Sequence, residues 1–388
     1  MKIIFLASSG GPGGASVALF NLIRELGKDN RLYVVFPQQG VFSRSLEELG
    51  IKCFFLPTYN LTVYPCYKTI NQKIKFTYRL VRKLYQNWTA QVALAKIVRN
   101  LKPDIIHTNV GPLDLGFKIA KKMNIKHVWH LREYQDLDFD LHFFPSKQKF
   151  IQMLQSSNSY SIAITRGIFN YWQLKEDRDR VIYDGVMPEI EHTYIAHKDN
   201  YFLFAGRIEE AKGVKVLLTA FYEFCKSNTV YNLFIAGTGT GSYMHECLSL
   251  IKDLKIEDRV HFLGQVSDIY KYMEKALALI VASRSEGFGF ITSEAMYNHC
   301  LVIGKDTAGT KEQFDLGLQE VKHEIGFRFT SEQELLSALE KAIQLSAHEY
   351  ETITSNAYYV VKKKYIVKKH ASEVNAFYTS ILQKTNIF

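Results

Sequence analysis

Residues 276–295, ALALIVASRSEGFGFITSEA, decide the fold class of this chain. The apolar run at the start of this stretch predicts a buried strand, and a turn containing glycine then leads into a predicted helix. This order is typical of open α/β sheets, which bind ligands at the carboxyl ends of their strands. We expect the backbone N–H groups of Gly287, Phe288 and Gly289 to face outward at the start of the helix, where the helix dipole favours phosphate.

Two carboxylates, Glu286 and Glu294, lie eight positions apart in the same stretch. The first falls on the turn and the second about two helical turns further on. Such a pair can accept hydrogen bonds from hydroxyl groups on two parts of one ligand. The alternative is a solvated acid followed by an acid that stabilises the start of a helix, and these residues alone do not decide between the two.

A second stretch, residues 201–213, YFLFAGRIEEAKG, also runs from an apolar strand into a loop. The loop carries Arg207 and Lys212, five positions apart. If the loop curls back, the guanidinium fork and the ammonium point charge can converge on one pyrophosphate. Two solvated surface cations beside Glu209 and Glu210 explain the same pattern equally well.

Taken together, the two stretches point to one protein family far more specifically than either stretch does alone. Residues 206–213 contain a Gly-Arg pair, four residues and a Lys-Gly pair, and two glutamates follow at 286 and 294. This combination resembles the second domain of the retaining nucleotide-sugar glycosyltransferases of GT-B fold, family four. Three further signals agree: a glycine-rich turn at 10–14, His130 after an apolar strand, and the sequence AGTKE at 308–312. The resemblance implies two Rossmann-like doubly wound domains facing a cleft, and a UDP- or GDP-sugar as donor with no other cofactor.

The alternation of short β-rich runs with helical periodicity supports an α/β fold. Twelve strands are predicted, at residues 2–7, 31–36, 51–56, 104–108, 126–130, 160–165, 180–183, 201–205, 232–236, 259–263, 276–282 and 301–304. Alternation of this kind indicates parallel, doubly wound sheets. The pattern restarts after a polar stretch, so we expect domains at 1–190 and 191–364. The resemblance further implies that a C-terminal helix, at about 365–388, packs back on the first domain.

Glycine-rich turns follow several of these strands. The turn at 10–15, GGPGGA, is neither the dinucleotide pattern, because position 16 is Ser, nor a Walker loop. Glycines there let a backbone approach phosphate closely, although tight turns use glycine anyway. The resemblance implies that Gly13 and Gly14 face the donor and that Gly206, Gly237 and Val266 also belong to the donor site, the last of them near the base.

His130 ends an apolar strand in the sequence WHLRE, residues 129–133. A histidine at the carboxyl end of a strand points toward the ligand region, where a neutral imidazole can donate to one sugar hydroxyl and accept from another. A buried structural histidine is the alternative. The resemblance implies contact with the donor sugar.

Acids in the sequence DLDFD suggest the metal-binding Asp-x-Asp of another glycosyltransferase fold. They are Asp136, Asp138 and Asp140, in a loop just past His130. Because the two loop cations at 207 and 212 would already neutralise a diphosphate, we expect the site to hold no metal.

The net charge of +9 is unevenly distributed. No acid occurs between Glu48 and Asp104, whereas residues 52–102 contain ten cations interleaved with aromatic residues. This segment can lie on an anionic membrane surface, or it can be a solvated face over packed aromatics. No nucleic-acid-binding module is recognised. The apolar start of the chain is too short for a signal peptide, so we expect a cytoplasmic protein, with peripheral attachment to the inner face of the membrane left open.

The expected function is therefore that of a retaining glycosyltransferase acting on a lipid-linked glycan or polysaccharide precursor, with a hexose as the transferred sugar. In the expected mechanism Arg207 and Lys212 stabilise the leaving diphosphate, Glu286 orients the donor sugar, Glu294 binds the ribose and His130 contacts the sugar. A nucleotide-sugar epimerase of the same fold and a non-catalytic, membrane-associated sugar-nucleotide-binding protein remain as alternatives.

Overall fold

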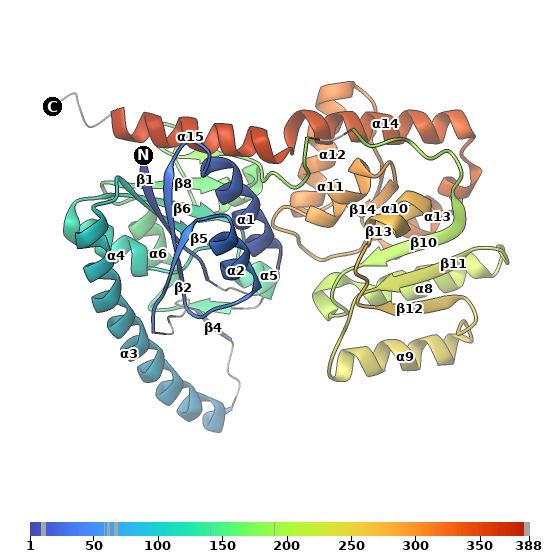
Figure 1. Cartoon of the computed structure of the whole chain (residues 1–388). Coiled ribbons are helices and arrows are strands. Elements are labelled where there is room, and N and C mark those ends of the chain that lie inside the picture. Colours follow the sequence, from blue (N-terminus) through green and yellow to red (C-terminus); the bar gives the residue numbers. More distant parts are fainter. Residues whose placement is uncertain are drawn as a thin grey trace. The chain divides into compact units, whose positions relative to one another are not determined.

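The computed structural model describes residues 1–8, 13–57, 59, 63–65, 69–139, 141–189 and 191–383. The chain forms two compact units (Figure 1), one of Met1–Gly185 with Val367–Phe388 and one of Val186–Ile366. The sequence placed these boundaries at 190/191 and 364/365. No helix in these described ranges is both long enough and apolar enough to cross a bilayer.

The N-terminal unit is built on a sheet of seven parallel strands in the order β3-β2-β1-β5-β6-β8-β9. Its strands are β1 (Lys2–Leu6), β2 (Arg31–Phe36), β3 (Lys52–Phe55), β5 (Ile105–Asn109), β6 (Lys126–Leu131), β8 (Ser159–Ala163) and β9 (Arg180–Val181). Two further strands, β4 (Val63–Pro65) and β7 (Leu141–Phe143), pair antiparallel. The order reverses between β1 and β5, which makes their carboxyl ends the topological switch point of this sheet.

Helices cover both faces of this sheet because alternate residues of a strand point to opposite sides. On β1, Ile3 and Phe5 pack with α1 (Gly14–Leu26) and α15 (Val367–Gln383). Ile4 and Leu6 pack on the other side with α3 (Ile70–Leu101) and α4 (Leu115–Met123). The other helices are α2 (Val41–Glu48), α5 (Asp136–Phe139), α6 (Lys147–Leu154) and α7 (Arg166–Tyr171). The C-terminal helix α15 thus completes the core of the N-terminal unit.

The C-terminal unit repeats the plan with six parallel strands in the order β12-β11-β10-β13-β14-β15. They are β10 (Asp199–Ala205), β11 (Asn232–Ala236), β12 (Val260–Gly264), β13 (Ala276–Val281), β14 (Leu301–Lys305) and β15 (Phe327–Phe329). From β10 the chain adds strands on one side, and from β13 it adds them on the other. The switch point therefore lies between the ends of β10 and β13.

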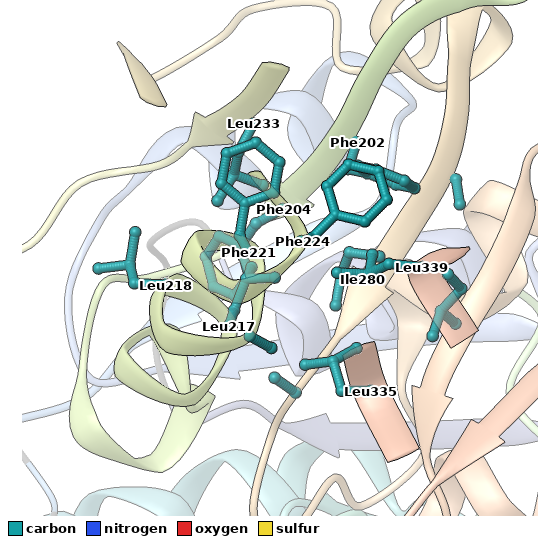
Figure 2. Packing of buried hydrophobic residues seen from close by; sticks show 14 of the residues in the cluster. Phe202, Phe204, Leu217, Leu218, Phe221, Phe224, Leu233, Ile280, Leu335 and Leu339 are labelled. Atoms are coloured by element: carbon teal, nitrogen blue, oxygen red, sulfur yellow. The ribbon is translucent and has the colours of Figure 1, made fainter. Parts of the chain in front are cut away.

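The helices of the C-terminal unit enclose a core rich in phenylalanine. They are α8 (Val214–Cys225), α9 (Ser242–Leu254), α10 (Tyr270–Lys275), α11 (Phe290–Tyr297), α12 (Ala308–Val321), α13 (Glu332–Gln344) and α14 (Ala347–Lys364), with a 3-10 turn, η1, at Glu210–Lys212. Figure 2 shows Phe202 and Phe204 of β10 against Phe221 and Phe224 of α8, all of them buried. This packing fixes β10 and α8, and with them the loop that joins them.

The predicted fold class is confirmed, and every predicted strand is present to within a few residues. The prediction missed β4, β7 and β15, each of which is three residues long.

Candidate functional site

The loops that follow β10 and β13 meet at the switch point of the C-terminal sheet. Arg284 N donates to Ala211 O over 2.8 Å, which joins the two loops through their main chains. Gly213, with φ +70°, lies so close to β13 that a Cβ at this position would come within 2.1 Å of Ala282 O. Glycine is required there, because any side chain would push the loops apart.

Lys212 and Glu286 form the centre of this junction. The Lys212 ammonium donates to Glu286 Oε1 over 2.6 Å, and the Ser283 hydroxyl donates to the same oxygen over 2.6 Å. The two charged side chains are mostly shielded, at 23% and 17% exposure. An ammonium has three N–H donors, so Lys212 can bind an anion while the carboxylate keeps it in place. The sequence predicted Lys212 and Glu286 as site residues but gave no signal for Ser283.

Arg207 does not join this group. Its Nη2 lies 3.1 Å from Glu209 Oε1, and its side chain is 65% exposed. The expected convergence of Arg207 with Lys212 is therefore not seen in this structure, where each cation pairs with a different acid. The reason is local, since an acid two positions away competes for an exposed guanidinium.

Residues of α12 hydrogen-bond to the main chain of the glycine turn before α11. The Gln313 amide donates to Phe288 O over 2.6 Å and to Gly289 O over 3.1 Å, and Gly309 N donates to Glu286 O over 2.8 Å. A Cβ on Gly309 would come within 2.4 Å of Phe288 O, so this position also requires glycine. The sequence singled out the segment containing Gly309 but gave no signal for Gln313.

Phe288 is anchored by its side chain. Its ring is buried and packs edge-on against Tyr365 and Phe290, with centroids 5.1 and 5.5 Å away. Gly289 caps α11 with φ +87°, a conformation that favours glycine. Phe288 can therefore serve a ligand only through its main chain, as the sequence predicted for this turn.

Glu294 lies on α11 in a poorly solvated position. Burial raises the pKa of its carboxyl group to about 7. The pKa of the nearby Tyr270 is raised by burial and, to a lesser extent, by the negative charge of Glu294. A carboxyl group shifted in this way beside a ligand-binding turn is typical of functional sites.

This shift has a measurable consequence for stability. In the unfolded chain Glu294 ionises near 4.5, whereas in the folded chain it keeps its proton to about 7. The unfolded state thus gains stability from ionisation as pH rises through this window, and the free energy of unfolding falls. We expect Glu294→Gln to be more stable than wild type at pH 8 by about 3 kcal/mol, with little difference at pH 4. Urea unfolding followed by circular dichroism at both pH values checks this, and an equal difference at both would contradict it.

The glycine-rich turns after β11 and β12 pack closely against the β10 loop. Gly237, with φ +139°, donates its N–H to Gly264 O over 2.7 Å, and a Cβ there would come within 1.8 Å of Gly206 O. These glycines thus have a structural role in joining three strand ends. Val266, in the loop after β12, is partly buried.

The family model for glycosyl transferases group 1 matches residues 188–359, almost the whole of the unit that contains this site. Over these residues the C-terminal unit is similar to this family. A crystal structure of Anabaena Alr3699/HepE in complex with UDP resembles the chain with a TM-score of 0.79 and 20% identity, over 98% of this chain and 100% of that one. The chain, with its two Rossmann-like units, thus has the GT-B fold.

Two curated relatives show the range of the sequence similarity. The Campylobacter jejuni N-acetylgalactosamine-N,N'-diacetylbacillosaminyl-diphospho-undecaprenol 4-alpha-N-acetylgalactosaminyltransferase is 35% identical over 121 residues, 31% of this chain and 32% of its own length. The Escherichia coli O-antigen biosynthesis glycosyltransferase WclY is 21% identical over 337 residues, 81% of this chain and 83% of its own length. The matches span about a third to a half of the length of the first four curated relatives.

Three of the predicted site residues, Gly13, Gly14 and His130, lie in the N-terminal unit. Gly13 and Gly14 start α1, and a Cβ on Gly13 would meet nothing within 4 Å. The preceding positions 9–12 lie outside the described residues.

His130 is fully buried within the N-terminal unit, and its contact with the donor sugar stays a prediction. Its side chain is fully buried on the α15 face of the sheet, with Nε2 3.8 Å from Asp184 Oδ1 and the ring 5.6 Å from that of His370. Burial and then the charge of Arg132 lower the pKa of His130 well below its ordinary value. This burial is what the alternative, a structural histidine, requires.

His130, Asp184 and His370 are also the one group among the described residues that has the spacing of a metal site. The hydrogen bonds argue against this use. Arg132 pairs with Asp184 Oδ2 and lies 3.4 Å from His130 Nδ1. A guanidinium only donates, so His130 Nδ1 accepts and the ring proton sits on Nε2, the atom that a metal would need. The group is therefore better described as a buried ion pair with neutral histidines around it.

The acids of the DLDFD loop have partners within the N-terminal unit. Asp136 binds Lys147 and the Tyr171 hydroxyl, and Asp138 Oδ2 accepts from Tyr134 N over 2.7 Å. Asp140 lies outside the described residues.

Proposed function

We propose that this protein is a retaining glycosyltransferase that moves a hexose from a UDP- or GDP-sugar to a hydroxyl group of a lipid-linked glycan or polysaccharide precursor. The observation that carries the proposal is the Lys212–Glu286 pair at the switch point of a group 1 transferase domain, next to the start of α11. An anchored ammonium beside a helix start is a suitable site for a diphosphate.

In the proposed reaction Lys212 neutralises charge on the leaving diphosphate as the glycosidic bond breaks. Arg207, exposed and held by one neighbouring acid, can swing in as a second cation. Because these cations supply the positive charge, we propose that transfer needs no metal ion.

Glu286 and Glu294 are proposed to bind the two sugar rings of the donor. Lys212 and Ser283 both bind Glu286 Oε1, which orients the carboxylate toward a hydroxyl of the transferred sugar. Glu294 is proposed to accept from the ribose hydroxyls. Its pKa of about 7 means that donor binding would strengthen as pH rises through neutrality. Gly13, Gly14, Gly206, Gly237 and Val266 are proposed to line the rest of the donor site through their main chains.

The donor and acceptor classes are supported by named relatives. The Anabaena protein has been crystallised with UDP-glucose, and the Campylobacter relative is named for a diphospho-undecaprenol acceptor. The Salmonella relative RfbU is named as an O-antigen chain mannosyltransferase.

A panel of UDP- and GDP-sugars, incubated with and without bacterial lipid extract, tests the proposal. We expect nucleoside diphosphate to be released from one donor, faster with the extract, and at the same rate after EDTA is added. Conversion of the nucleotide sugar to an isomer would indicate the epimerase. Binding of a donor without any turnover would indicate the non-catalytic protein.

We further propose that α3 attaches the protein to an anionic membrane. Eight large apolar side chains on α3 are 42–76% exposed: Ile70, Ile74, Tyr78, Val81, Leu84, Tyr85, Trp88 and Val92. At 100° per residue they fall within about 120° of one another, so they form one stripe. The segment has no acid, and each cation near an anionic surface contributes about 1 kcal/mol.

Vesicle flotation checks this attachment. We expect the protein to float with vesicles containing 30% phosphatidylglycerol and the Tyr85→Glu/Trp88→Glu variant to lose binding by about tenfold or more, since both side chains are over half exposed. Leu248→Glu on α9, where the leucine is 43% exposed, is the matched control. Equal binding by all three proteins would show that the stripe is not the membrane contact.

A further inference from the structure

A small cavity lies on the inner side of α3, between this helix and the β4–β7 pair. Its volume is about 180 Å³. Its apolar lining comes from Val63, Pro65, Phe76, Leu80, Leu84 and Phe144. An apolar cavity of about 150 Å³ can hold a benzene ring, whereas sites for whole ligands are usually about 300–1,000 Å³. This cavity therefore fits a short hydrocarbon segment and is too small for a sugar nucleotide.

Two cations, Arg79 and Lys83, border the cavity, and the described residues that line it include no acid. Lys83 is partly buried, and its ammonium donates to Val63 O over 3.3 Å. Burial and the nearby Arg79 charge lower the pKa of Lys83. An anion is stabilised by a partly shielded ammonium that lies beside a second cation and donates to a neutral carbonyl.

The cavity is continuous with the exposed apolar stripe of α3. Leu84 contributes to both, because it lines the cavity and is 42% exposed. A ligand that combines hydrocarbon with a phosphate can thus reach the cavity from the surface that we propose to contact the membrane.

We propose that this cavity binds the lipid end of the acceptor, with the first carbons of an isoprenoid chain among the apolar side chains and its phosphate or diphosphate between Arg79 and Lys83. The inference rests on the proposed function, since it names the class of acceptor. It adds a site for the lipid in the N-terminal unit that is separate from the donor site of the transferase domain.

Binding of farnesyl diphosphate, below its micellar concentration and without any sugar nucleotide, tests the proposal by calorimetry. Inorganic pyrophosphate and farnesol are the partial probes. We expect farnesyl diphosphate to bind at least about tenfold more tightly than either of them. The Arg79→Gln/Lys83→Gln variant should weaken this binding at least about tenfold, because two charge-assisted hydrogen bonds are lost. Arg82→Gln/Lys96→Gln, on the same helix but away from the cavity, should change it less than about twofold.

Several results would overturn the proposal. Pyrophosphate binding as tightly as farnesyl diphosphate would mean that the apolar cavity contributes nothing. Equal weakening in both double variants would mean a general charge effect. Full competition by phosphatidylglycerol vesicles would assign the cavity to bulk lipid. If farnesyl diphosphate binds as expected but no donor is consumed, the proposed transfer reaction fails and the lipid site stands.

Discussion

The Lys212→Met variant is expected to lose about two to three orders of magnitude in kcat and to unfold at the same temperature as wild type. Removing one preorganised donor to a developing negative charge typically costs this much in rate. Lys212 is 23% exposed and ends the short turn η1, and Glu286 keeps the Ser283 hydroxyl as a donor after the change. Folding therefore tolerates the substitution while catalysis does not.

The matched control is Lys215→Met, a lysine of the neighbouring α8 that pairs with Glu246 at the surface. We expect its kcat to stay within about twofold of wild type, as exposed ion pairs contribute little. The kcat of Glu286→Gln should fall about as much as that of Lys212→Met, since the ion pair between these two side chains positions both. Initial rates of nucleoside diphosphate release measure all three, and wild-type rates in Lys212→Met and Glu286→Gln would refute the assigned site.

The Arg132→Met variant is expected to destabilise the N-terminal unit by about 3–5 kcal/mol, because it leaves the Asp184 carboxylate buried without its cation. Both side chains are essentially inaccessible, at 2% and 0% exposure. Arg132 also donates to Asn109 Oδ1 over 2.9 Å, so the substitution also removes a hydrogen bond at the end of β5. All three tryptophans, Trp88, Trp129 and Trp172, lie in this unit, so urea unfolding followed by tryptophan fluorescence reports on it directly.

Two further variants separate the ion pair from other effects. Arg166→Met breaks the exposed pair with Glu176 and should cost less than about 1 kcal/mol. The double variant Arg132→Met/Asp184→Leu should recover much of the stability, because replacing a whole buried pair is often neutral. A loss below 1 kcal/mol in Arg132→Met would contradict the account of this cluster.

The strands and the loops that follow them could be predicted because they depend on local pattern. Short apolar runs in alternation with helical periods specify parallel strands, and polar residues directly after a strand lie at the carboxyl edge of the sheet. The same rule placed Lys212 and Glu286 at this edge although they are far apart in the sequence, and their roles came from the family resemblance. The strands β4, β7 and β15 were not predicted, because a run of three residues is too short to show the alternation of a strand.

Which side of a strand a residue faces, and what it meets there, could not be predicted. His130 lies two positions after Val128, which packs on the α15 face, so the period of the strand turns the imidazole into the core. Its neighbours, Asp184 and His370, come from distant segments. The raised pKa of Glu294 and the support from Gln313 likewise arise only from tertiary packing.

The most direct test of the central claim is a crystal structure of the protein with the nucleoside diphosphate that it releases. We expect phosphate oxygens to lie within hydrogen-bonding distance of Lys212 Nζ and of main-chain N–H groups at the start of α11. Phosphates bound elsewhere, with Lys212 still paired only to Glu286, would contradict it.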